Sequence, residues 1–544
     1  MAVADTLYFG GPILTIDRLQ PEVQALAVRD GRILALGALQ DLQSHIGPTT
    51  TRVDLKGQAL LPGFVEAHSH PYGYGRIWGE PLVNIRASHI PSYDAVIATI
   101  QRRVAKAKPG EVLAFVGLDA LRHEGMREPT LAEMDAWAPD NPLAIYTFNF
   151  HSLFLNSRMM ALLGLDASTV DYPGARHARD AQGRLTGKMV EFAAFHNFDR
   201  VCQQFGSDRG LRELSGGLWK FARAGITTAA DLGPHVGAMA AYQRVWEQGS
   251  MPIRLRVYAR AAMGGPPIPK LLDWGGDDVR MSGVKVWADG SPFVGTAWLS
   301  RPYLTNEMTL KGLSLAPGYA GHMNYEPDQL HEIIEHYASQ GWQVATHVQG
   351  DRTMDTVLDV FEAVLKKHSP PASPHRIEHC GTVSDKQLAR TLELGMVCSF
   401  FVPHVYHWGD AIRDALLGPE RASNYMPAGS ATRLGMRVSY HSDAPMTEPD
   451  PLLSIQTAVT RRTASGQVLG EHQRVSLEEG LRAMTIDAAY QIGMDQEVGS
   501  LEIGKRADFV LLAQDPRQVA AETLASIEVR GTWIDGRPVW SASA

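Results

Sequence analysis

The sequence predicts an α/β fold in which eight parallel strands and their helices close into a (β/α)8 barrel, the TIM barrel. Three features of the chain support this fold. Eight apolar runs of strand length alternate with helical or loop segments, both ends of the chain are rich in short strands, and an unusually long interval follows the first run. We therefore expect a barrel with a small β-rich domain made from both termini and an inserted subdomain after barrel strand 1.

The two ends of the chain share this β-rich character. Short strand-like pieces flank Asp30-Gly31 near the start and Asp535-Gly536 near the end. Asp-Gly is typical of the two-residue turn of a β-hairpin, because both positions of that turn need a positive φ. We expect residues 1–58 and 495–544 to form one composite β-sandwich domain.

Residues 59–494 hold the runs that we expect to be barrel strands. Most of the intervals between them hold a segment with helical periodicity, such as Pro327–Gln340, whose apolar side chains fall on one face. Eight strands close a barrel of this type. The expected strands are Leu61–Ala67, Ile226–Asp231, Ile253–Ala259, Gly283–Ala288, Gln343–His347, Arg376–Cys380, Met396–Phe401 and Arg437–Asp443.

The interval after the first barrel strand is too long for a single crossover connection. It contains strand-like pieces of its own, Val112–Val116 and Leu143–Phe148. We expect an inserted lid subdomain at about residues 75–220 that covers the mouth of the barrel.

Composition narrows the classes of partner. The 544-residue chain has 51 Lys and Arg against 59 Asp and Glu, a net charge of −8, so it lacks the basic stripe that nucleic acid requires. No apolar run is long enough to span a membrane, and the first residues lack the features of a signal peptide. Cys202, Cys380 and Cys398 are far apart, which argues against disulfides and favours three buried thiols in a cytoplasmic protein. A homodimer is compatible with the sequence.

The first barrel strand ends in His68-Ser69-His70. Side chains alternate along a strand, so His68 and His70 point to the same side and can bind one metal ion together. Chance alone nearly accounts for one such pair in a chain with 20 histidines. The metal hypothesis therefore depends on further ligands elsewhere in the sequence.

Other expected strands also end in groups suited to metal binding. His347 ends the fifth, His379 the sixth and Asp443 the eighth. The C-terminal ends of barrel strands meet at one rim, where the active sites of such barrels lie. We therefore expect these side chains to join His68 and His70.

Lys285 lies inside the apolar run of the fourth expected strand, where an unpaired ammonium is costly. Burial lowers the pKa of a lysine and frees its amine to react, for instance with carbon dioxide to give a carbamate that can bridge two metals. Two alternatives stay open. The amine could reach the surface, or it could pair with Asp289 or Glu191.

His404 and His407 follow the seventh expected strand. We interpret both as solvent-exposed loop histidines. The alternative is that one of them lines the active-site pocket. His331 and His336 are five positions apart on the helix expected at Pro327–Gln340. That spacing places them too far around the helix to share a metal, so we expect an amphipathic surface helix.

Taken together, these motifs resemble those of the amidohydrolase superfamily, and within it a branch of long metal-dependent amidohydrolases that includes N-substituted formamide deformylases. Two positions depart from the family pattern: Glu66 stands where Asp is usual, and the segment before His404 lacks the usual Gln-Pro. The matching segments span nearly the whole chain in the family's order. They are Pro62–His70, Gly225–Thr228, Lys285–Ser291, His347–Arg352, Arg376–His379, Ser442–Pro445 and Gly499–Val510.

The resemblance implies a zinc centre. His68, His70 and Asp443 would bind the more buried ion and His347 and His379 the second, with one or two Zn²⁺ left open. Lys285 would bridge two ions as a carboxylated lysine. Candidate substrate contacts are His151, Trp287, Asp289, Arg352 and His404.

The implied activity is that of a zinc-dependent amidohydrolase, which cleaves a C–N bond in a small N-substituted amide or formamide. A metal-activated hydroxide would attack the carbonyl, with Asp443 as general base and then general acid. Aromatic residues near the expected mouth, such as Trp287, suggest an aromatic or apolar group on the substrate. The alternatives are a cyclic amide or amidine hydrolase or deaminase, and an N-acyl-D-amino acid deacylase.

Overall fold

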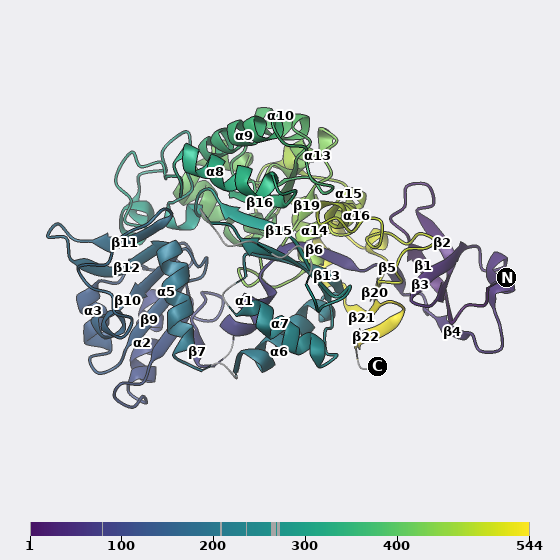
Figure 1. Ribbon diagram of the computed structural model, residues 1–544, viewed down its shortest axis with the longest axis horizontal. Coiled ribbons are helices and arrows are strands. Elements are labelled where there is room, and N and C mark those ends of the chain that lie inside the picture. Colours follow the sequence, from purple (N-terminus) through teal and green to yellow (C-terminus); the bar gives the residue numbers. More distant parts are fainter. Residues whose placement is uncertain are drawn as a thin grey trace.

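The central sheet of the computed structural model is a parallel barrel of eight strands in the order β19-β18-β17-β16-β15-β14-β13-β6 (Figure 1). The structure describes residues 2–78, 80–206, 209–234, 237–262, 268 and 272–542, with only the backbone of 209–213. All eight expected strands are present, which confirms the barrel. They are β6 (Phe64–Ser69), β13 (Ile226–Leu232), β14 (Arg254–Arg260), β15 (Val279–Trp287), β16 (Gln343–Val348), β17 (Arg376–His379), β18 (Val397–Phe400) and β19 (Ser439–Tyr440).

Two hydrogen bonds link the edge strands β6 and β19 and nearly close the sheet. The backbone N–H of His70 donates to the carbonyl of Ala444 at 2.7 Å. The N–H of Ser442 donates to Oε1 of the buried Glu66 at 2.9 Å. Glu66 thus helps to hold the first and last strands together.

Helices lie between the barrel strands and cover the outside of the barrel (Figure 1). The expected amphipathic helix is α8, in which Leu330, Ile333, Ile334 and Tyr337 are buried. The helices of this region are α6 (Arg209–Arg223), α7 (Ala238–Glu247), α8 (Pro327–Ala338), α9 (Asp351–Leu365), α10 (Asp385–Glu393), α11 (Pro403–Ala411), α12 (Pro419–Ser423), α13 (Ala428–Arg433), α14 (Pro451–Thr460), α15 (Leu477–Ala483) and α16 (Ile486–Gln491), with the short turns η2 (Pro292–Val294), η3 (Met308–Gly312), η4 (Ile412–Leu417) and η5 (Glu471–Gln473).

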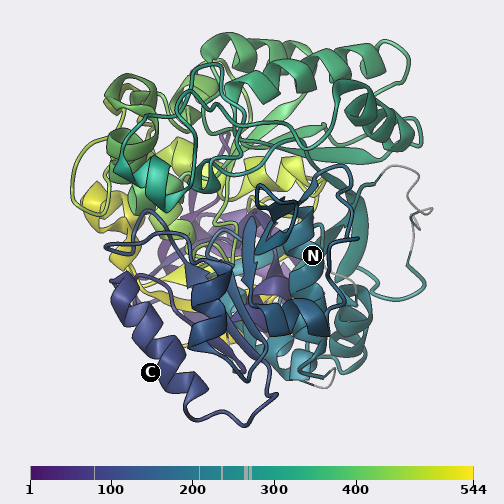
Figure 2. The same cartoon turned by 90° about the vertical axis from the view of Figure 1, so that its left-hand side faces the viewer.

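The interval between β6 and β13 forms a second sheet, of six strands in the order β11-β12-β10-β9-β8-β7. Both strand-like pieces expected there are strands, β8 and β9. Figure 2 views the molecule from the side of this inserted sheet. Its elements are β7 (Leu82–Asn84), β8 (Leu113–Leu118), β9 (Leu143–Thr147), β10 (Ser152–Leu155), β11 (Ala175–Arg179) and β12 (Leu185–Glu191), with α1 (Pro71–Ile77), α2 (Tyr93–Val104), α3 (Leu131–Trp137), α4 (Ser157–Leu162) and α5 (Phe192–Gln203).

A third sheet joins the two ends of the chain, because β20 pairs antiparallel with β5. Asp30-Gly31 and Asp535-Gly536 form its tight turns, each with positive φ at both residues. The two-layer sandwich and the exact domain limits remain predictions. The strands are β1 (Thr6–Leu14), β2 (Glu22–Arg29), β3 (Arg32–Gly37), β4 (Thr51–Asp54), β5 (Ala59–Pro62), β20 (Phe509–Leu512), β21 (Val529–Ile534) and β22 (Arg537–Ser541), with the turns η1 (Asp41–His45), η6 (Pro516–Gln518) and η7 (Ala521–Ser526).

Cys202, Cys380 and Cys398 are buried and carry free thiols, in agreement with their expected role as small apolar residues. Within the described ranges, no helix is both long and apolar enough to cross a membrane.

Candidate metal centre

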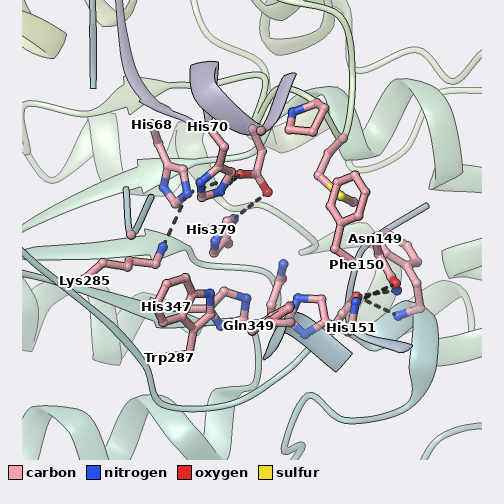
Figure 3. A pocket seen from close by; sticks show the side chains of 18 of the residues that line it. His68, His70, Asn149, Phe150, His151, Lys285, Trp287, His347, Gln349 and His379 are labelled. Carbon is pink, nitrogen blue, oxygen red and sulfur yellow. Dashed lines mark hydrogen bonds and ion pairs between the residues drawn. The ribbon is translucent and has the colours of Figure 1, made fainter. Parts of the chain in front are cut away.

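The His-Ser-His motif lies where β6 ends and α1 begins, and both imidazoles face the same carboxylate (Figure 3). Nε2 of His68 lies 3.3 Å from Oδ1 of Asp443, and Nε2 of His70 lies 3.1 Å from the same oxygen. Asp443 follows β19 and has a φ of 51°, a sparsely populated backbone conformation for a non-glycine residue. The alternation of side chains along β6 thus brings the two histidines together as expected.

A buried carboxylate fixes the orientation of His68. Nδ1 of His68 donates to Oε2 of Glu378 at 2.6 Å, which leaves Nε2 to face Asp443. Burial alone would raise the pKa of Glu378, but Arg376 and His68 more than offset it and lower the pKa to about 2. Glu378 is therefore ionised, and it holds His68 in the tautomer suited to metal binding through Nε2.

Asp289 orients His347 in the same way. Nδ1 of His347 donates to Oδ1 of Asp289 at 3.1 Å, and the backbone N–H of Gly350 and the hydroxyl of Thr353 donate to Oδ2, each at 2.8 Å. The bond leaves Nε2 of His347 free. Asp289 therefore supports a candidate ligand and is not among the residues that line the cavity described below.

His379 and His441 bring two further imidazoles to the same place. The rings of His68 and His441 are stacked with centroids 4.4 Å apart, and those of His347 and His379 are also 4.4 Å apart. Nδ1 of His379 and both ring nitrogens of His441 are buried without a hydrogen-bond partner among the described residues. Burial, with the neighbouring imidazoles, lowers the pKa of both rings well below the usual value, so both are neutral.

Lys285 is fully buried, and its Nζ lies 3.3 Å from Nε2 of His68. Neither sequence alternative is observed, because the amine does not reach the surface, and Asp289 and Glu191 bond to His347 and His151 instead. Burial is the main cause that lowers the pKa of Lys285 to about 8. A neutral amine is therefore accessible near physiological pH, which a carbamate requires.

The donor set fits a metal ion of the zinc type. One ligand atom each from His68, His70 and Asp443 lies within 4.8 Å of the others, and the same holds for His68, His379 and His441. Oδ1 of Asp443 is buried and has no hydrogen-bond donor among the described residues, although histidine nitrogens surround it. Imidazole nitrogens and carboxylate oxygens are the ligands that zinc prefers beside thiolates. An ion among these atoms would satisfy groups that are otherwise costly to bury.

All six ligands expected from the sequence line one cavity of about 80 Å³. His151, Trp287 and His404, expected as substrate contacts, also line it. Arg352 does not, because it lies on the exposed side of α9 with its guanidinium 4.6 Å from the ring centroid of Trp298. The described residues thus gather nine of the eleven expected site residues around one space and leave Asp289 and Arg352 outside it.

His404 and His407 do not lie in a loop, as the sequence favoured, but on helix α11, which begins at Pro403. His404 is fully buried and lines the cavity, which corrects its interpretation as solvent-exposed. His407 is half-buried and lies outside the cavity lining. Proline is favourable at the first position of a helix, and His404 follows it in the first turn of α11.

The inserted subdomain supplies part of the cavity wall. The turn between β9 and β10 contributes Asn149, Phe150 and His151 (Figure 3). Nδ1 of His151 donates to Oε2 of the buried Glu191 at 2.7 Å. The aromatic side chains in the lining are Tyr146, Phe150, Phe195, Trp287 and Phe293.

Sequence reasoning assigned no role to Glu378, Asp231 or His441. Asp231 is the second-last residue of β13; its carboxylate accepts a hydrogen bond from the hydroxyl of Tyr242 and lies 3.9 Å from Nδ1 of His70. His441 lies two positions before Asp443, so the same alternation that pairs His68 with His70 could have identified it. Glu378 and Asp231 gave no such signal, because the histidines that they face, His68 and His70, are distant in sequence.

Comparison with known proteins gives consistent results. A family described as "Amidohydrolase family" matches residues 51–540. The chain is 26% identical to an N-substituted formamide deformylase of Arthrobacter pascens, over 98% of this chain and 97% of that protein. Crystal structures of uncharacterized metal-dependent hydrolases from Pyrococcus horikoshii and Pyrococcus furiosus are similar, with TM-scores of 0.71 and 0.68 and identities of 24% and 25%. The first covers 95% of this chain and 99% of its own, and the second 94% and 99%.

Proposed function

This chain belongs to the amidohydrolase family, and from that premise we propose that it is a zinc-dependent hydrolase of a C–N bond in a small N-substituted amide or formamide. The observation that carries the proposal is the set of buried histidine and aspartate atoms at the C-terminal rim of the barrel, with Lys285 beside them. His68, His70 and Asp443 would hold one ion, and His347 and His379 a second, with carboxylated Lys285 between them. The similarity to a formamide deformylase supports this substrate class.

A bound zinc ion would polarise the substrate carbonyl and lower the pKa of a water molecule. Asp443 would accept the proton of that water and return it to the leaving nitrogen, because its carboxylate faces both His68 and His70. Burial opposes ionisation of Asp443, but the two histidines lower its pKa well below the usual value. The carboxylate is therefore ionised at neutral pH, which is the form that an acceptor role requires.

The lining of the cavity favours an apolar or aromatic group beside the scissile bond, since Trp287 and Phe293 face the same space as the candidate ligands. The inserted subdomain would act as a lid that admits this group, because Phe150 and His151 complete the wall. The cavity of about 80 Å³ has room for about five to eight water molecules, at about 10–15 Å³ for each.

One observation favours a second substrate class. Arg260 lines the cavity, and its Nε donates to the carbonyl of Gly233 at 2.8 Å. A guanidinium beside the reaction site could bind a substrate carboxylate. This supports the alternative of an N-acyl-D-amino acid deacylase.

The test is a comparison of chelator-treated and zinc-reloaded protein on N-formyl, N-acetyl and N-aryl amides, cyclic ureas and N-acyl-D-amino acids. We expect hydrolysis of an N-substituted amide that disappears on chelation and returns with zinc. Lys285→Ala should lose metal and activity, with partial recovery when a short carboxylic acid is added. Lys311→Ala, which removes an exposed lysine paired with Glu307, is the matched control and should change neither. Hydrolysis that persists in metal-free protein would refute the proposal.

A further inference from the structure

His404 stands at the start of α11 with its two ring nitrogens in different surroundings. Its Nδ1 lies 3.0 Å from the hydroxyl of Tyr425, which is also fully buried. Its Nε2 is buried and has no hydrogen-bond partner among the residues that the structure describes. The residue is only 1% exposed and lines the same cavity as His70 and Asp443. A buried polar atom without a partner is costly, and it suggests a ligand that supplies one.

The hydrogen bond to Tyr425 fixes the tautomer of His404. A phenol hydroxyl carries one proton, and the ring nitrogen of His404 is the partner that the described residues offer to this hydroxyl. The buried hydroxyl therefore donates to Nδ1, because the reverse arrangement would leave its own proton unbonded. In a neutral imidazole the other nitrogen then carries the proton. Nε2 of His404 is thus an N–H donor.

The surroundings of the ring keep it neutral and fixed. The ring of Phe401 packs against it with centroids 3.9 Å apart, and those of Phe293 and Trp408 lie at 4.7 and 5.5 Å. Burial lowers the pKa of His404 to about 3, so it does not become a cation at neutral pH. A neutral donor between aromatic rings is poorly solvated, which strengthens any hydrogen bond it makes.

We infer that Nε2–H of His404 donates to the carbonyl oxygen of the substrate, with Tyr425 as the residue that positions and polarises it. This inference rests on the proposed amide hydrolysis and assigns the group that binds the reacting oxygen from the side of α11. The carbonyl oxygen is the main hydrogen-bond acceptor of an amide, and it gains negative charge when water adds to the carbonyl carbon. A fixed donor aimed at that oxygen favours the transition state over the ground state. His404 forms no covalent bond and keeps its proton throughout.

The kinetic test compares His404→Phe with His404→Gln in zinc-loaded protein. Phenylalanine keeps the planar apolar shape but removes the donor, so we expect kcat to fall about 10²- to 10³-fold with a smaller change in KM. Glutamine restores an N–H donor, so kcat of His404→Gln should fall less than kcat of His404→Phe. His407→Phe, one turn along the same helix and outside the cavity lining, is the matched control and should stay close to wild type. An equal fall in kcat for the Phe and Gln variants, or a rise in KM with kcat unchanged, would overturn the assignment.

The tautomer can be measured without any substrate. In ¹⁵N-histidine spectra of the wild-type protein, assigned through the His404→Gln variant, we expect Nε2 of His404 to be protonated and Nδ1 to be unprotonated. Tyr425→Phe should weaken this preference and lower kcat while metal content stays the same. Protonation at Nδ1 in wild-type protein would refute the donor role whatever the activity. If the spectra agree but none of the amides is hydrolysed, the proposed function fails and the tautomer assignment stands.

Discussion

Two clusters of buried charged side chains lie at opposite ends of the barrel, and they differ in how well their atoms are paired. At the N-terminal end, Arg254 begins β14, and its two terminal nitrogens form ion pairs with Asp508 and with Asp535, the latter at 2.5 Å, while its Nε has no hydrogen-bond partner among the described residues. At the C-terminal end, Asp443 and His379 keep buried polar atoms without hydrogen-bond partners among the described residues. Both clusters are costly to desolvate, but in the first the buried guanidinium charge faces two carboxylates of the protein.

The difference separates a structural cluster from a functional one. The Arg254 cluster joins the barrel to the sheet made from both termini, because Asp508 directly precedes β20. The cluster around Asp443 is incomplete without a ligand, and perturbed groups of that kind gather at functional sites. If this distinction is right, substitutions at the first cluster should change stability, and those at the second should change activity or metal binding.

The largest effect should come from Asp443→Asn. The amide cannot accept the proton of the attacking water, so we expect kcat to fall about 10²- to 10⁴-fold, together with weaker metal binding. Steady-state kinetics and elemental analysis of the same sample measure both. Asp328→Asn, at an exposed position in the first turn of α8, is the control. Full activity with full metal content in Asp443→Asn would remove this residue from the mechanism.

At the other cluster, Asp508→Asn should lower the free energy of unfolding by about 3–5 kcal/mol, because Arg254 would keep a buried charge with one fewer partner. Catalytic constants of the folded protein should not change. Denaturant unfolding followed by circular dichroism provides the measurement. Glu420→Gln breaks an exposed ion pair with Arg301 at 3.3 Å and should cost less than about 1 kcal/mol. Equal costs for the two variants would contradict the comparison.

The same contrast exists within β17, which has His375 before its first residue and His379 at its end. His375 is buried and its Nδ1 accepts the N–H of Val344 at 3.0 Å, and burial lowers its pKa to about 4. The unfolded chain binds a proton near pH 6.5, so stability should fall as the pH drops from about 6.5 to about 4, by up to about 3 kcal/mol.

His375→Asn provides the control for that pH dependence. Its amide oxygen can accept the N–H of Val344 but does not titrate, so the variant should lose less stability between pH 6.5 and 4 than wild type. Unfolding midpoints across this range test the prediction. Parallel curves for the two proteins would show that His375 contributes nothing to acid sensitivity.

A smaller effect should follow from Asp289→Asn. The carboxylate fixes His347 through Nδ1, so its loss should weaken metal binding about 10- to 100-fold without unfolding the protein. Competition with a chromophoric chelator measures this affinity. Asp351→Asn removes a carboxylate that accepts the N–H of Ser300 at 2.8 Å away from the cavity, and it should bind metal like wild type. Unchanged affinity in Asp289→Asn would show that His347 needs no such support.

Much of the fold and site could be predicted from the sequence. The alternation of strand and helix predicts the barrel, and the rule that strand ends meet at one rim predicts that His68, His347 and Asp443 lie together. The sequence missed the carboxylates that orient these ligands, because Glu378 and His68 are 310 positions apart and only the closed barrel makes them neighbours. The sequence also favoured an exposed loop for His404, since local sequence does not show that the first turn of α11 lines the cavity.

The sequence by itself determined which residue types occur at each strand end, because side-chain alternation and strand length are local properties. The tertiary structure decided which of their atoms are paired. Arg254 meets Asp508 only where the terminal sheet packs on the barrel, and in His404 the fold gives Nδ1 a partner in Tyr425 but gives Nε2 none among the described residues. Pairing depends on burial and on contacts between distant segments, and those are fixed only when the whole chain has folded.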